Sequence, residues 1–104
     1  MTRIAFQRTG GVIGQVMDLR LDLDKLPKEE AKHLESLIGN ADFFRLPENL
    51  VALSTSEEFQ YTLTIHERLV QHTVRVTDTS APGKLRILID ELATLAVINM
   101  HGLL

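Results

Sequence analysis

The feature that most constrains the fold is the alternation of apolar and polar side chains over residues 59–77. Apolar residues occupy the odd positions from Phe59 to Ile65, with polar residues between them. The pattern continues on even positions from Val70 to Val76, with His72 among them. A period of two places alternate side chains on one face of a strand. The segment therefore predicts an antiparallel hairpin that is covered on one face only.

A turn at Glu67-Arg68 sets the predicted register of this hairpin. The expected pairs on the apolar face are Phe59–Val76, Tyr61–Val74, Leu63–His72 and Ile65–Val70, and those on the polar face are Thr62–Thr73 and Thr64–Gln71. His72 then lies on the apolar face, and we expect it to be a hydrogen-bonded histidine of the core or sheet edge.

A second hairpin is predicted around the stretch TGGVIG, residues 9–14. Gly10-Gly11 has the composition of a two-residue hairpin loop. With such a loop the predicted pairs are Thr9–Val12, Ile4–Met17, Thr2–Leu19 and the opposite-charge pair Arg3–Asp18. Nearer the loop the pattern is less regular, with Phe6 facing Gln15 and Arg8 facing Ile13. We therefore expect a bulge at Gly14.

Each hairpin is followed by a segment with helical spacing. The first predicted helix has Pro27 at its first helical position, with Leu26 as the cap, and ends at Gly39 or Asn40. Residues 47–57 after it are expected to form a loop. The second opens at residues 80–83 with Ser80 as the candidate cap. It is expected to end at Gly102, with Leu103 folding back onto Ile98. Its predicted buried face consists of Leu85, Leu88, Ile89, Leu92, Leu95 and Ala96.

The order of these segments is ββα-ββα. It predicts an α+β fold, a two-layer sandwich in which two helices cover one face of a four-stranded antiparallel sheet. With 104 residues, of which 44% are hydrophobic, the chain is expected to form one domain over residues 1–104.

Composition argues against several classes of protein. The formal net charge is −3, which is not typical of a nucleic-acid binder. No apolar run approaches the roughly 18 residues that span a membrane, and the first residues do not resemble a signal peptide. With no cysteine there is no disulfide and no thiolate chemistry. We expect a soluble, cytoplasmic protein.

Catalytic patterns are missing from the sequence. The four histidines form no His-Glu-x-x-His motif, and strand alternation puts His66 and His72 on opposite faces. His33 is expected on the helix surface. Asp22 and Asp24 could form an acid/base pair, but we interpret them as solvated. No serine lies in a nucleophile elbow, and the glycines of residues 10–14 do not precede a helix. We expect no enzymatic activity, no metal and no cofactor.

Two interpretations remain for residues 9–14. In the first, the glycines form a turn and a bulge, and Val12 and Ile13 pack on the sheet. In the second, the segment is a presented recognition loop. Glycine lets a partner's backbone approach closely, and two β-branched side chains can fill apolar pockets of the partner.

The ordered motifs resemble a known family. They are Phe6-x-Arg8-x-Gly10-Gly11-x-x-Gly14, then Ala41-Asp42-Phe43-Phe44-Arg45-Leu46-Pro47, then Phe59-x-Tyr61-Thr62-Leu63-Thr64-Ile65, and then His72-Thr73-Val74-Arg75-Val76. Together they resemble the emfourin family, small bacterial protein inhibitors of thermolysin-like zinc metalloproteases, typified by the inhibitor encoded beside protealysin.

The resemblance implies reversible inhibition of a thermolysin-like, protealysin-type protease in the cytoplasm. Because such proteases favour bulky aliphatic residues after the scissile bond, we expect the hairpin tip, residues 9–14, to enter the active-site cleft. The predicted contact residues are Thr9, Gly10, Gly11, Val12, Ile13 and Gly14. A main-chain carbonyl and a carboxylate are both candidates for approaching the enzyme's zinc. Residues 54–57 and the turn at Glu67-Arg68 are the next candidate contacts.

The alternative function is a non-inhibitory protein-interaction module. It would bind a partner or a second copy through the polar sheet face (Thr62, Thr64, Gln71 and Thr73) or through residues 98–104.

Overall fold

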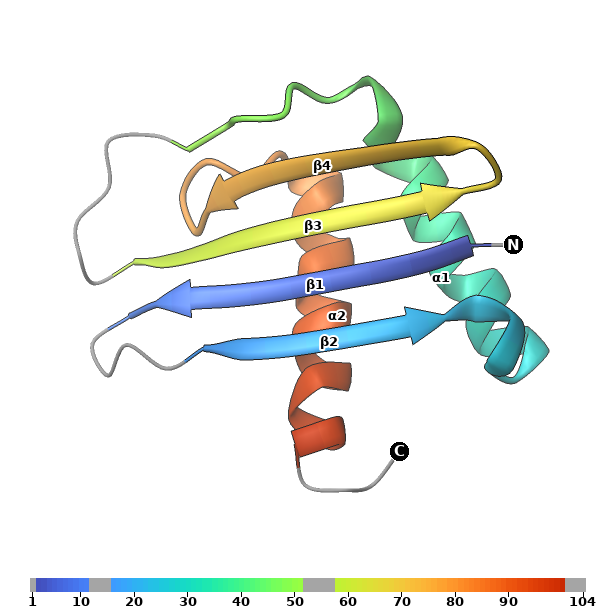
Figure 1. Cartoon of the computed structure of the whole chain (residues 1–104). Helices are drawn as coiled ribbons and strands as arrows, with labels where there is room; N and C mark the ends of the chain where they lie inside the picture. Colours follow the sequence, from blue (N-terminus) through green and yellow to red (C-terminus); the bar gives the residue numbers. More distant parts are fainter. Residues whose placement is uncertain (1, 12–15, 52–57, 101–104) are drawn as a thin grey trace.

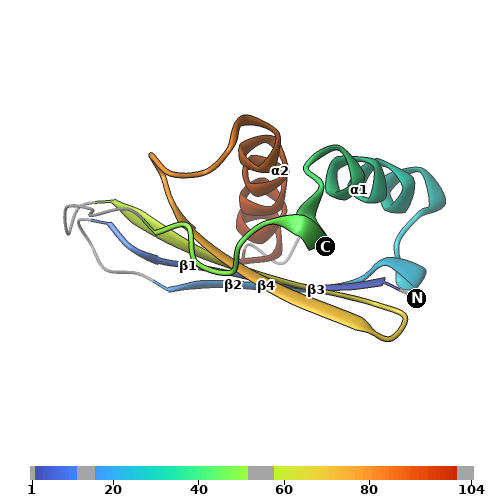
Figure 2. The ribbon, with the colours of Figure 1, turned by 90° about the horizontal axis from the view of Figure 1, so that it is seen from above.

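A computed structural model describes residues 2–11, 16–51 and 58–100. The strands are β1 (Thr2–Gly10), β2 (Met17–Asp22), β3 (Phe59–Glu67) and β4 (Val70–Thr77), and the helices are α1 (Lys28–Asn40) and α2 (Gly83–Met100). Two short 3-10 turns, η1 (Leu23–Lys25) and η2 (Phe43–Arg45), flank α1. The strands form one antiparallel sheet in the order β2-β1-β3-β4. Both helices lie on the same face of it (Figures 1 and 2), which confirms the predicted fold class.

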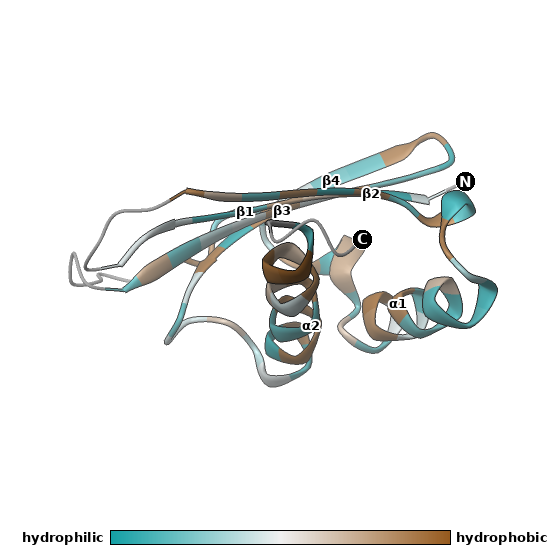
Figure 3. Cartoon of the chain, turned by 90° about the horizontal axis from the view of Figure 1, so that it is seen from below, coloured by the Kyte–Doolittle hydropathy of each residue, from teal (hydrophilic) through white to brown (hydrophobic). Residues whose placement is uncertain are grey.

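The core lies between the sheet and the two helices. Alternation explains the contribution of the strands, because every second side chain points toward the helices. The buried hydrophobic residues of the strands are Ile4, Phe6, Met17, Leu19, Tyr61, Leu63, Ile65, Val74 and Val76. All six residues predicted for the inner face of α2 are buried, and α1 adds Leu34 and Ile38. Figure 3 shows the hydrophobic segments of both helices on this side of the sheet.

The β3–β4 hairpin forms as predicted, but its register differs. The turn residues are Arg68 and Leu69, so the pairs on the apolar face are Tyr61↔Val76, Leu63↔Val74, Ile65↔His72 and Glu67↔Val70. The displacement of two residues keeps every side chain on its predicted face. It also places Thr64 opposite Thr73, and their hydroxyl oxygens are 2.8 Å apart.

The register of the first hairpin was predicted wrongly. The observed pairs run from Arg3↔Asp22 to Arg8↔Met17, so Ile4 faces Leu21 and Phe6 faces Leu19. The last pair between the two strands is Arg8↔Met17, and β1 itself continues to Gly10, so Gly10-Gly11 is not a two-residue loop. The reason is long-range pairing, because β1 also pairs with β3 along its whole length, from Thr2↔Glu67 to Gly10↔Phe59. The bulge predicted at Gly14 lies outside the described residues.

The outer edge of β4 is covered by the segment that follows η2. Arg75 donates its backbone N–H to the carbonyl of Glu48 and accepts a bond from the N–H of Leu50, both at 2.8 Å. His72 is half-buried, and its Nε2 lies 2.7 Å from the carbonyl oxygen of Leu46. The prediction of a hydrogen-bonded edge histidine is confirmed.

The predicted helix boundaries are partly confirmed. Helix α1 ends at Asn40 as expected, but Pro27 occupies the cap position and the first helical residue is Lys28. Ser80 does not cap α2. Its Oγ accepts hydrogen bonds from the backbone N–H and the hydroxyl of Thr77, at 2.8 and 2.9 Å. Ser80 therefore stabilises the turn after β4. The predicted stop at Gly102 lies outside the described residues.

Candidate functional site

The structure describes half of the predicted contact segment. Thr9 and Gly10 are the last two residues of β1, and Gly11 follows them at the end of the sheet (Figure 1). Val12, Ile13 and Gly14 lie outside the described residues. The chain re-enters the described part at Val16, whose side chain is 59% exposed, immediately before β2. We call this end of the sheet, with Thr9–Gly11 and Glu58–Phe59, the glycine end.

Both glycines are required by the backbone. Gly10 has φ +88° and Gly11 has φ +75°, a left-handed region that side-chain-bearing residues rarely adopt. A Cβ on Gly10 would lie 2.8 Å from the carbonyl oxygen of Glu58. A Cβ on Gly11 would lie 2.5 Å from Cε1 of Phe59. The glycines therefore allow the end of β1 to pack closely against Glu58 and the start of β3.

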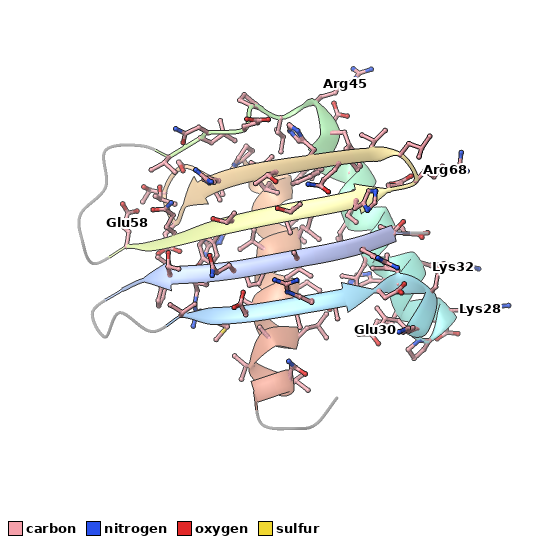
Figure 4. The ribbon with its side chains drawn as sticks, viewed as in Figure 1. Lys28, Glu30, Lys32, Arg45, Glu58 and Arg68 are labelled. Carbon is pink, nitrogen blue, oxygen red and sulfur yellow. The ribbon has the colours of Figure 1, made fainter. Side chains whose placement is uncertain are left out.

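Of the other two candidate segments, only the turn after β3 lies in the described residues. Residues 54–57 are outside the described residues, but the chain returns at Glu58, beside Gly10 and Gly11. The backbone N–H of Gly11 donates to the carbonyl of Glu58 at 3.3 Å. The turn at Arg68-Leu69 joins β3 to β4 at the end of the sheet opposite the glycine end, as the positions of Glu58 and Arg68 in Figure 4 show. The turn at Arg68-Leu69 is therefore remote from the glycine end, whereas the described chain resumes at Glu58, within it.

A hydrogen-bond network supports the glycine end from the helix side of the sheet. Asp78, the first residue after β4, accepts a hydrogen bond from the backbone N–H of Phe59 at 3.0 Å. Its carboxylate also accepts the hydroxyl of Tyr61 at 2.8 Å and Nη1–H of Arg86, on α2, at 3.1 Å. One carboxylate therefore joins the start of β3 to the end of β4 and to α2.

Burial and hydrogen bonds determine the direction of the pKa shifts in this network. Burial first, and then the hydrogen bond to Asp78, raise the pKa of Tyr61 to about 12. Burial alone would raise the pKa of Asp78, but bonds from Tyr61, Phe59 and Arg86 outweigh it and hold the pKa below its ordinary value. The pKa of Arg86 is raised: burial opposes the shift, while Asp78 and Asp90 favour the charged form.

The ring of Phe59 is held between its neighbours. The guanidinium carbon of Arg8 lies 4.2 Å from the ring centroid of Phe59, within cation–π distance. The ring of Tyr61 is also close, with its centroid 6.4 Å from that of Phe59, and it stacks in turn on Phe6 at 6.0 Å. A movement of Phe59 would therefore disturb the side chains of Arg8 and Tyr61 directly. Sequence patterns treated it only as a core residue of a strand.

The remaining predicted polar residues do not form a catalytic site in the described part of the chain. Asp22 is 4.0 Å from Arg3 and accepts the N–H of Asp24, which is a local turn contact. His33 is exposed and lies 4.0 Å from Glu91, and His66 is also exposed. Within residues 2–11, 16–51 and 58–100, no three His, Asp or Glu side chains are grouped so that they could hold a metal ion. The same ranges contain no helix that is both long and apolar enough to cross a membrane.

Sequence reasoning missed the Asp78 network. It recorded Asp78 only as one of many carboxylates, because its partners lie 17 and 19 residues before it and no local motif joins them. The one available signal was position, since Asp78 immediately follows a strand whose predicted partner begins with Phe59 and Tyr61. The wrong register of that hairpin concealed this signal.

Comparison with protein-family models gives a match to the model named Emfourin over residues 6–93. The match runs from the middle of β1 into α2 and so includes the glycine end and the Asp78 network. Comparisons with curated proteins and with solved structures found no match. The family match covers most of the chain and confirms the resemblance of its motifs. The chain belongs to the Emfourin family, a family of protein inhibitors, and this membership indicates a protease-inhibitor role with a protease as the partner.

Proposed function

We propose that this protein reversibly inhibits a thermolysin-like zinc metalloprotease of the protealysin type. In this proposal the segment Thr9–Gly14 enters the active-site cleft of the enzyme. The protein would act in the bacterial cytoplasm and protect cell proteins from cleavage. Family membership supports the inhibitory role, and the geometry of the glycine end supports the choice of contact segment.

The observation that carries the choice of segment is the close packing of Gly10 and Gly11 against β3. Two consecutive residues with positive φ are held by the pair Gly10↔Phe59 and by the bond from Gly11 to Glu58. On the other side, Arg8↔Met17 closes the connection. The segment is thus anchored at both ends on a sheet, which reduces the conformational entropy that binding would cost.

The composition of the segment suits an apolar pocket. Val12 and Ile13 follow directly after the two constrained glycines, and Val16 on the far side is largely exposed. An inhibitor interface of ordinary size buries roughly 1,600 Å² in total, and a few central residues contribute most of the affinity. Val12 and Ile13 are the residues that we expect to be central.

The test is titration of thermolysin, and of a protealysin-type protease, with the native chain and with a Val12→Ala/Ile13→Ala double variant. Loss of a central anchor should cost on the order of 2 kcal/mol, which raises the inhibition constant roughly 30-fold. The matched control is Ile87→Ala, because Ile87 is a 56% exposed aliphatic residue on α2 and is not part of the proposed contact segment. It should leave inhibition unchanged.

Three results would contradict parts of the proposal. If the native chain inhibits neither protease, the proposed target class is wrong. If the double variant inhibits as well as the native chain, the contact lies elsewhere, and Leu69→Ala at the opposite end of the sheet becomes the next variant to measure. If the native chain is inactive and light scattering shows a dimer that dissociates on removal of residues 99–104, the interaction module is the better description.

A further inference from the structure

A carboxylate outside the proposed contact segment fixes the start of β3. The last pair between β3 and β4 is Gln60↔Thr77, yet the contact continues beyond it. Asp78 donates its backbone N–H to the carbonyl of Phe59 at 3.3 Å and accepts the N–H of Phe59 on its carboxylate at 3.0 Å. Both backbone groups of Phe59 are therefore held by Asp78, and the bond from Tyr61 sets the direction of that carboxylate.

Phe59 in turn determines where the two glycines can lie. It pairs directly with Gly10, and its ring occupies the space in which a side chain of Gly11 would be built. A movement of Phe59 by a fraction of an ångström would therefore move the backbone of Gly11 or open a gap beneath it.

Thr79 holds the adjacent residue in the same way. Its hydroxyl donates to Oε1 of Glu58 at 2.7 Å, and the carbonyl of Glu58 accepts the N–H of Gly11 at 3.3 Å. Asp78 and Thr79 are consecutive, and so are Phe59 and Glu58. The turn after β4 therefore holds both Glu58 and Phe59, the two residues that contact the glycines.

We propose that Asp78 is a positioning residue for protease binding, which acts through Phe59 to hold Gly10 and Gly11 in their positive-φ backbone conformation. Asp78 itself need not touch the protease. The inhibitory consequence rests on the proposed function, whereas the structural consequence can be measured without any protease.

The chain offers a matched control for this idea. Arg86 contacts two carboxylates, Asp78 through Nη1 and Asp90 through Nε at 3.0 Å. Asp90 lies one turn further along α2 and is exposed. Asp78→Asn and Asp90→Asn are therefore the same chemical change at the same arginine, and only the first alters the contacts of Phe59.

The experiment measures two quantities for each variant. The first is the hydrogen-exchange rate of the Gly11 amide by NMR, and the second is the inhibition constant against the protease that the native chain inhibits. Both are measured well below the melting temperature, with folding verified by circular dichroism. For Asp78→Asn we expect each quantity to rise at least about tenfold, the scale of one lost hydrogen bond to a charged group. For Asp90→Asn we expect changes below about twofold, as for an exposed pair.

A merely structural role would lower the melting temperature of Asp78→Asn but leave the inhibition constant of the folded variant unchanged, and that result would overturn the proposal. An unchanged exchange rate at Gly11 would also overturn it. If Asp78→Asn does not fold, Thr79→Val takes its place, and unchanged exchange and inhibition there count equally against it. Inhibition by neither the variants nor the native chain would refute the proposed function, while faster Gly11 exchange in Asp78→Asn would still support the positioning of the glycine end.

Discussion

Replacement of Asp78 by asparagine should lower the pKa of Tyr61, and the chain is well suited to this measurement. Tyr61 is the only tyrosine, and there is no tryptophan, so absorbance of the phenolate reports one residue. In the native protein burial is the largest cause of the raised pKa, and the hydrogen bond and charge of Asp78 come next. Asparagine keeps an acceptor oxygen but removes the charge. The pKa should therefore fall below about 12 yet stay above the ordinary value of 10.0, because burial is unchanged.

The same shift predicts how stability depends on pH. The folded protein favours the neutral phenol, so the unfolded chain loses this proton first as pH rises. The contribution of Tyr61 to the free energy of unfolding is complete below pH 10 and is lost between pH 10 and about 12. Two pKa units correspond to roughly 2–3 kcal/mol, of which Asp78→Asn should remove a part. Thermal melts of the native chain and the variant across this range measure the difference.

Two results would refute this reasoning. An unchanged titration midpoint in Asp78→Asn would show that the carboxylate does not contact the phenol. A midpoint at the ordinary value would show that burial is not the main cause of the shift. Asp90→Asn is the control and should leave the midpoint where it is.

Three further predictions concern stability. Gly11→Ala should destabilise the fold by about 1–3 kcal/mol, measured by denaturant unfolding, since a Cβ there combines positive φ with a 2.5 Å approach to Phe59; a cost under about 0.5 kcal/mol would contradict the described backbone. Arg68→Gly should stabilise the protein, because Arg68 has φ +55°, by up to about 1 kcal/mol in the same assay; a loss of stability would show that the arginine side chain makes a compensating contact. Acid should lower the melting temperature of the native protein more than that of the Asp78→Asn variant. The lowered pKa of Asp78 contributes stability that is present above the ordinary pKa of a carboxyl group and is lost as pH falls through the pKa of the folded state. Thermal melts near pH 3 and pH 7 check this, and an equal decrease in both proteins would contradict it.

The glycine end shows where the sequence was sufficient and where it was not. The glycines themselves, and the need for an unusual backbone there, could be read from TGGVIG. Their position in the sheet could not be predicted, because the register of the N-terminal hairpin was inferred from its own two strands alone. In the fold β1 lies between β2 and β3, and pairing with β3 over its full length carries Gly10 beyond Met17, the first residue of β2, to pair with Phe59. Phe59 lies far along the chain, so no pattern within residues 1–23 could indicate this pairing.

The sequence by itself determined the order of the strands and α-helices, the face that each strand buries and the inner face of α2. These properties depend on periods of two and 3.6 residues, which are local and survive a shift of register. Only the tertiary structure decided which residues are opposite one another, and so it alone brought Asp78 to Phe59 and Tyr61. Registers that differ by two residues bury the same side chains. The choice between them depends on specific contacts, such as Thr64 with Thr73 and the hydrogen bond from the Phe59 N–H to Asp78, whose partners are separated in the sequence.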